Sequence, residues 1–211
     1  MIRVRTGNVL SIDGREAGVT RLTVLVDGER APAVNYDDLT GAVAEGDKVL
    51  LNTTAVHLDL GTGGMYFVMG VVGRETEYEG TGHIVKCRYT PVQATVRAVE
   101  EPASPHHDAL KDGELDGVPV LVATLHSMVP AAAAVLKAER PHASVVYVMT
   151  DGAALPAQWS RLLGHMKRTG LVDAVITAGH AFGGDYEAVT IYSALLAAKR
   201  VCAADFVIVA M

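Results

Sequence analysis

Residues 175–193, VITAGHAFGGDYEAVTIYS, decide the class of fold. An apolar run ends in a Gly-rich loop and a helical pattern follows, so this stretch predicts a strand, a loop and a helix in succession. Such units build open α/β sheets, in which ligands bind at the carboxyl ends of the strands. His180, Gly183, Gly184 and Asp185 are therefore the first candidates for a ligand-binding site.

Strand and helix patterns continue to alternate on both sides of this stretch. Apolar runs predict four buried strands at 118–124, 145–149, 174–177 and 206–210, and helical patterns connect them at 130–137, 156–169 and 186–201. A further helix is predicted to start at Thr90, with Pro91 in its first turn. Buried strands joined by crossover helices predict a mainly parallel, doubly wound α/β domain over residues 81–211.

The first eighty residues have a different pattern. Short runs rich in β-branched residues occur at 2–12, 19–26, 30–36, 48–52 and 65–72. Asp27-Gly28 is a strong hairpin signal between two of them, and no helical period intervenes. We expect residues 1–80 to form a separate β-rich domain, a small barrel or a sandwich, with the polar stretch 73–82 at the boundary.

Composition excludes several classes of protein. Eighteen Lys and Arg residues against 24 Asp and Glu give a net charge of −6, which argues against nucleic acid as a partner. The amino-terminal arginines precede no apolar signal-peptide core, and no apolar run is long enough to span a membrane. Two distant cysteines, Cys87 and Cys202, form no disulfide framework, and we interpret both as buried and reduced. A soluble cytoplasmic protein, monomeric or homo-oligomeric, is the expectation.

Polar residues follow the other predicted strands as well. His126 and Ser127 come after the first of them, and Thr150, Asp151 and Gly152 after the second. Because the carboxyl ends of parallel strands share one edge of the sheet, these residues are expected to line one crevice with the loop at 179–185.

Three chemistries can be considered at this crevice. Gly179 to Gly183 has the outline of a nucleophile elbow, but Ala181 stands where the serine would be. Ser127 is the spare nucleophile, although it also fits a helix N-cap before Pro130. A strand-to-helix turn that needs small residues explains the glycines equally well.

Phosphate binding is the second chemistry. Backbone amides of Gly183, Gly184 and Asp185 at a helix N-terminus would attract an anion, whereas the Asp185 carboxylate would repel it and could act as a plain N-cap.

Binding of a divalent metal ion is the third chemistry. Asp151, His180 and Asp185 are hard ligands for Mg, Mn or Zn, and His126 could join them, but capping residues and core histidines are the alternative interpretation.

Several segments resemble an uncharacterised bacterial protein family of unknown function. They are KCRYTPVQ (86–93), TLHSMVPAA (124–132), YVMTDGAALP (147–156) and TAGHAFGGDYEAV (177–189), with VNYDDLTG (34–41) and LLNTTAV (50–56). The resemblance implies no activity and no catalytic residue. It implies longer chains, in which the last strand runs on into a further Gly-rich loop, so we expect part of the crevice to lie beyond Met211.

Two classes of function follow from these patterns. One is a protein that binds a small polar or phosphorylated metabolite at the carboxyl edge of the sheet, and that acts on it as a metal-assisted enzyme. The other is a non-catalytic ligand-binding or assembly module.

Overall fold

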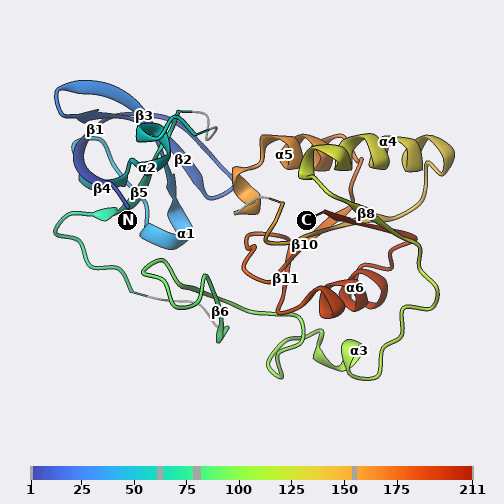
Figure 1. Ribbon diagram of the computed structural model, residues 1–211. Helices are drawn as coiled ribbons and strands as arrows, with labels where there is room; N and C mark the ends of the chain where they lie inside the picture. Colours follow the sequence, from blue (N-terminus) through green and yellow to red (C-terminus); the bar gives the residue numbers. More distant parts are fainter. Residues whose placement is uncertain (1, 61–63, 78–81, 154–155, 211) are drawn as a thin grey trace. The chain divides into compact units, whose positions relative to one another are not determined.

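The computed structural model describes residues 2–60, 64–77, 82–153 and 156–210 (Figure 1). The chain folds as two compact units, Met1–Glu79 and Gly80–Met211. The domain boundary predicted at residue 80 falls within 78–81, outside the described residues. In the described parts of the chain, no helix is long and apolar enough to cross a membrane.

The first unit is a closed barrel of five strands in the order β1-β2-β3-β5-β4. Its strands are β1 (Val4–Glu16), β2 (Val19–Val26), β3 (Glu29–Tyr36), β4 (Lys48–Asn52) and β5 (Tyr66–Val71), with one-turn helices α1 (Asp37–Thr40) and α2 (Thr54–His57). β3 and β5 are parallel, and the other pairs are antiparallel. Of the two predicted architectures, the chain therefore adopts the barrel.

Alternation along β2 explains the barrel. Leu22, Val24 and Val26 point inward into one buried cluster, whereas Thr23 and Leu25 between them are partly exposed. The predicted hairpin turn is present between β2 and β3. Asp27 and Gly28 both have positive φ, 52° and 87°, as the tight two-residue turn requires.

The second unit contains a sheet of five parallel strands in the order β11-β10-β9-β12-β8. The strands are β8 (Val120–Ala123), β9 (Val145–Met149), β10 (Ala174–Ala178), β11 (Tyr186–Ala188) and β12 (Phe206–Ala210). The helices are α3 (His107–Lys111), α4 (Val129–Glu139), α5 (Arg161–Arg168) and α6 (Ile191–Arg200), with 3-10 turns η1 (His126–Met128) and η2 (Ala157–Trp159). A separate two-stranded hairpin, β6 (Ile84–Lys86) and β7 (Ala94–Val96), precedes them.

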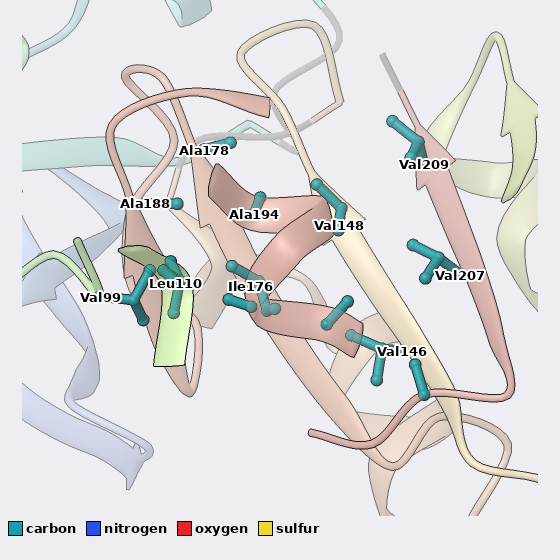
Figure 2. Close-up of a cluster of buried hydrophobic side chains, with 13 residues drawn as sticks. Val99, Leu110, Val146, Val148, Ile176, Ala178, Ala188, Ala194, Val207 and Val209 are labelled. Carbon is teal, nitrogen blue, oxygen red and sulfur yellow. The ribbon is translucent and has the colours of Figure 1, made fainter. Parts of the chain in front are cut away.

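Two buried clusters place the helices on opposite faces of this sheet. Alternate strand residues such as Tyr147 and Ile208 pack with α4 and α5. Their neighbours Val146 and Val207 pack with α6 and α3 on the other face, as Figure 2 shows for the second cluster. The predicted doubly wound α/β architecture is confirmed.

One predicted helix was wrong, and a second begins later than predicted. The stretch after Thr90 forms turns and strand β7, because Ala94–Val96 pairs with Ile84–Lys86 and tertiary pairing overrides the helical spacing of the valines. The predicted helix at 186–201 begins only at Ile191. Its first residues form β11 beside β10, and Thr190 caps the helix through a reciprocal contact with Ser193.

The first strand of the sheet was predicted to be buried, and this is also wrong. Val120, Leu121 and Val122 in β8 are 38%, 41% and 61% exposed. β8 is an edge strand, and α4, which follows it, packs on β12 and β9 instead. Its apolar side chains are therefore left largely uncovered.

Candidate functional site

The carboxyl edge of the parallel sheet brings two of the predicted strand ends into contact. One carboxylate oxygen of Asp151, Oδ1, accepts hydrogen bonds from the backbone amides of His180 at 2.6 Å and of Ala181 at 3.3 Å. The Asp151 residue itself is exposed. Its second oxygen accepts no hydrogen bond from the described residues, so the clamp orients a carboxylate whose other oxygen is available to a ligand.

Thr150 and Gly152 complete the turn that carries Asp151. The Thr150 hydroxyl donates to the carbonyl of Ala210 at 3.0 Å, which ties the end of β9 to β12. The amide of Ala153 donates to the Thr150 carbonyl, closing a tight turn over Asp151 and Gly152. These two residues therefore position Asp151 through the backbone.

In the loop at 179–185, the amides of Gly183, Gly184 and Asp185 all donate to acceptors within the protein. The amide of Gly183 donates to Glu187 Oε1 at 2.6 Å, and that of Gly184 donates to the Thr177 hydroxyl at 3.2 Å. The amide of Asp185 donates to the carbonyl of Val175 at 2.8 Å. The predicted anion site at these amides is not formed, because the loop folds back along β10 and its donors are used internally.

Asp185 consequently lies away from Asp151. Its carboxylate accepts from the Val175 amide at 2.9 Å, at the amino end of β10, and pairs with Lys167. Asp151 lies past the other end of that strand, about 15 Å away at the usual rise per residue. Asp185 is also not a helix cap, since Thr190 holds that position.

The proposed metal ligands are thus not assembled. Asp151 contacts the backbone of His180, while Asp185 lies at the opposite edge. Among the described residues, no group of three or more His, Cys, Asp or Glu side chains is placed to hold a metal ion.

A buried ion pair lies beneath the loop, and the sequence did not reveal it. Lys86, 1% exposed at the end of β6, lies 3.3 Å from Glu187 Oε2. Its ammonium donates to the carbonyls of Ala181 at 3.0 Å and Ala188 at 2.9 Å. The Thr177 hydroxyl donates to Glu187 at 2.8 Å. The pair thus connects the β6–β7 hairpin to the loop at Ala181 and to β11 at Glu187 and Ala188.

Burial determines the protonation tendencies of this pair. Loss of solvation lowers the pKa of Lys86, an effect that the nearby Glu187 carboxylate opposes. Loss of solvation likewise raises the pKa of Glu187, opposed by Lys86 and by the amide of Gly183. The ammonium has three acceptors for its three protons, so Lys86 fixes the loop and has no free donor for a ligand.

His126 takes part in a second polar network at the same edge. Its Nδ1 lies 2.9 Å from the Tyr147 hydroxyl, and its Nε2 lies 2.7 Å from the Ser160 hydroxyl. Ser160 is the N-cap of α5 and accepts from the Leu163 amide. Burial lowers the pKa of His126 and raises that of Tyr147. His126 is therefore a neutral connector between β9 and α5.

Ser127 has no part in this network. It is exposed within η1, and α4 follows Met128 without a side-chain cap. The predicted N-cap role of Ser127 was wrong, because the 3-10 turn leads directly into the helix. The serine that His126 contacts is Ser160, which the sequence did not single out since it lies on another element.

Two polar atoms beside the loop are buried without a partner among the described residues. They are His180 Nδ1 and Gln158 Oε1. Gln158 lies against Gly183, where any side chain atom would collide with it, and the Ala157 amide donates to the Phe182 carbonyl at 2.8 Å. Unpaired buried polar atoms are uncommon, and an ordered water or an ion is the usual partner of such atoms.

The two cysteines are free and half-buried. Burial raises the pKa of Cys87, and the nearby Asp151 carboxylate adds to this effect. Burial raises the pKa of Cys202 to about 11. Neither thiol is activated as a nucleophile.

The fold and this edge define an α/β protein with a small β-barrel and a polar carboxyl edge centred on Asp151. The chain belongs to the DUF3866 family, proteins of unknown function, whose model matches residues 32–211. No curated protein and no solved structure matched the chain.

Proposed function

We propose that the α/β unit binds a small polar molecule bearing hydroxyl or amino groups at the carboxyl edge of its sheet. The observation that carries the proposal is the geometry of Asp151. Two backbone amides donate to one carboxylate oxygen of Asp151, and the other oxygen is available to accept a hydrogen bond from a ligand. Acidic side chains at strand ends bind ribose and sugar hydroxyls in this way in other open α/β sheets.

The neighbouring groups favour a ligand of the same kind. Gln158 Oε1 is a second acceptor beside the loop, and His180 Nδ1 is a donor or an acceptor according to its tautomer. Both atoms are buried, so a water molecule that bridges them to a ligand would satisfy them, since it can both donate and accept. Both lie against or within the loop that Asp151 clamps.

A phosphorylated ligand fits this edge less well. The amides of Gly183, Gly184 and Asp185 are engaged by protein acceptors, and the ammonium of Lys86 is fully used. The exposed Asp151 carboxylate would repel a phosphate group. A neutral or cationic ligand is therefore the better match.

A binding role also fits better than a catalytic one. All three protons of the Lys86 ammonium have acceptors. Burial raises the pKa of the Cys87 thiol, which favours its protonated form. The ring of His126 is hydrogen-bonded to two hydroxyl groups. A metal-assisted reaction through Asp151 and Asp185 would need two carboxylates that lie at opposite ends of β10. The non-catalytic alternative is accordingly the one we propose.

Thermal melting in the presence of defined probes tests this function. The probes are free pentoses, free hexoses, glucosamine, inorganic phosphate, and the chlorides of Mg²⁺, Mn²⁺ and Zn²⁺. We expect at least one sugar or amino sugar to raise the melting temperature of the wild type, and neither phosphate nor the metals to do so. Asp151→Asn should abolish this rise in melting temperature. The side-chain NH2 group of asparagine would stand where the free carboxylate oxygen accepts from the ligand, and two donors would then face each other.

Asp205 provides a matched control. Its carboxylate also caps a backbone amide, that of Ser144 at 2.8 Å, but at the amino edge of the sheet. Asp205→Asn should lower the melting temperature without changing the response to the sugar. A wild type stabilised only by phosphate or metal, or by none of the probes, would contradict the proposal.

A further inference from the structure

Strand β8 is an unusual sheet edge. Three of its four side chains are large, apolar and 38–61% exposed, and Leu125 and Met128 just beyond it are exposed as well. β8 pairs with β12 on one side, and no described strand pairs with its other side. Natural sheet edges usually carry charges or other features that prevent pairing, because an open apolar edge attracts another strand.

The register fixes which backbone groups of β8 are open. The amide of Val207 in β12 donates to the carbonyl of Pro119 at 3.0 Å. Successive residues of a strand direct their amide and carbonyl to opposite sides, so Leu121 and Ala123 also face β12. The amides and carbonyls of Val120 and Val122 face outward. Pro119 does not block the edge, since its missing N–H is on the β12 side.

We propose that β8 is a homodimerisation edge, which pairs antiparallel with β8 of a second copy about a two-fold axis at Leu121. This register sets Val120 of each copy opposite Val122 of the other. Each such pair exchanges two backbone hydrogen bonds, so all four outward groups of each copy are satisfied. The contact is self-complementary, as a two-fold interface requires.

The side chains select a second copy over a free peptide. Val120 and Val122 lie on the α6 face of the sheet with Val207 and Val209, and Leu121 lies on the α4 face with Ile208. A lone strand would satisfy the backbone and leave both faces exposed. A second copy brings its own Val120, Leu121 and Val122, so apolar side chains of the two copies pack beside one another on both faces of the strand pair.

The absence of charge points to the same partner. Residues 118–128, VPVLVATLHSM, contain no Lys, Arg, Asp or Glu. Two identical copies of this segment therefore do not repel each other, and nothing in it would select an oppositely charged partner. The pairing also joins two five-stranded sheets into one continuous sheet.

Light scattering coupled to gel filtration of the full chain, over a range of concentrations, tests the dimer. We expect the wild type to have twice the mass of one chain at high concentration. Val122→Lys should raise the dissociation constant at least about tenfold, because it places a charge at each end of the apolar contact. Val135→Lys is the matched control, since Val135 on α4 is 63% exposed and Val122 61%. The control should dimerise like the wild type.

A cross-link tests the register independently. Leu121 faces its own copy as a non-hydrogen-bonded pair with Cα atoms about 4.5 Å apart, which a disulfide can bridge. In a chain with Cys87 and Cys202 replaced by serine, Leu121→Cys should form a covalent dimer on mild oxidation, and Val135→Cys should not. A wild type that stays monomeric at every concentration, or equal effects of the lysine variants, would overturn the proposal.

Discussion

The ring of His126 joins two hydroxyl groups, and the burial of one of them decides its tautomer. Tyr147 is fully buried, and its hydroxyl has His126 Nδ1 as its described partner. If the ring donated to Tyr147, the tyrosine proton would lack an acceptor, which costs about 1–3 kcal/mol. Tyr147 therefore donates to Nδ1, and Nε2–H donates to Ser160. In this arrangement the ring cannot act as a base toward Ser160.

This assignment predicts a pH dependence of stability. Burial lowers the pKa of His126 in the folded protein, so the unfolded chain, with a histidine pKa of about 6.5, takes up a proton first as the pH falls. The contribution of neutral His126 to the free energy of unfolding is therefore fully present above a pH of about 6.5, and it is lost as the pH falls through the lower pKa of the folded state. Urea unfolding between pH 8 and 5 should show a smaller loss for His126→Gln than for the wild type.

The exposed His142 provides the control for this experiment. His142→Gln should keep the wild-type dependence on pH, because this side chain lies outside the network that His126 forms with Tyr147 and Ser160. If the free energy of unfolding changed equally with pH in the wild type and in His126→Gln, the stability of the network would not depend on a neutral His126.

The pair of Lys86 and Glu187 should contribute strongly to the stability of the α/β unit. Glu187→Gln leaves the Lys86 ammonium buried without its carboxylate, and breaking a buried pair costs about 3–5 kcal/mol. The double variant Lys86→Met with Glu187→Gln should recover part of this loss, since no charge stays buried. The fluorescence of Trp159, the single tryptophan, reports urea unfolding of this unit.

The exposed pair of Arg200 and Asp116, 3.1 Å apart, is the comparison. Asp116→Asn should cost less than about 1 kcal/mol, because solvent screens an ion pair at the surface. A Glu187→Gln variant as stable as Asp116→Asn would mean that Lys86 finds solvent when its partner is removed.

At the scale of elements, strands bounded by turn signals were predictable. The bounds of β2, β4, β9 and β12 agree with the runs at 19–26, 48–52, 145–149 and 206–210. Each has enough consecutive apolar or alternating residues to define a strand by its own pattern. The hydrogen bond between Asp151 and the His180 amide also follows from the strand pattern, because both residues come directly after strands whose carboxyl ends share one edge.

The elements that were missed are short and depend on distant partners. β7 and β11 have three residues each, and they exist because β6 and β10 offer them hydrogen bonds. The path of the loop to Asp185 depends on Thr177 and Glu187, whose side chains hold the amides of Gly184 and Gly183. Local spacing contains no signal for such contacts, so Asp185 was placed at the wrong edge.

The barrel also bears on the choice of partner. A closed five-stranded Greek-key barrel is the architecture of OB folds, many of which bind oligonucleotides or oligosaccharides. Here Arg5, Arg15 and Arg74 lie within 4 Å of Asp27, Asp37 and Asp47 respectively. Arginines already paired with carboxylates are poorly placed to bind phosphates, so these three do not contribute to a phosphate-binding surface on the barrel.

At the scale of the whole molecule, each hydrophobic cluster lies within one unit. The barrel cluster contains residues between Val9 and Val71, and the two α/β clusters contain residues between Val99 and Ala210. Cooperative unfolding follows from a shared core. Separate cores therefore predict separate unfolding transitions for the two units.

A core truncation in each unit tests this prediction. Leu22 is 1% exposed in the barrel, and Leu22→Ala should destabilise the barrel by about 2–5 kcal/mol. Met166 is fully buried in the α/β unit, and Met166→Ala should cost a similar amount there.

Trp159 fluorescence follows the α/β unit alone, whereas far-ultraviolet circular dichroism follows both. We expect Leu22→Ala to move a dichroism transition and leave the fluorescence midpoint unchanged, and Met166→Ala to move the fluorescence midpoint. If Leu22→Ala shifted the fluorescence midpoint as much as Met166→Ala does, the two units would unfold as one.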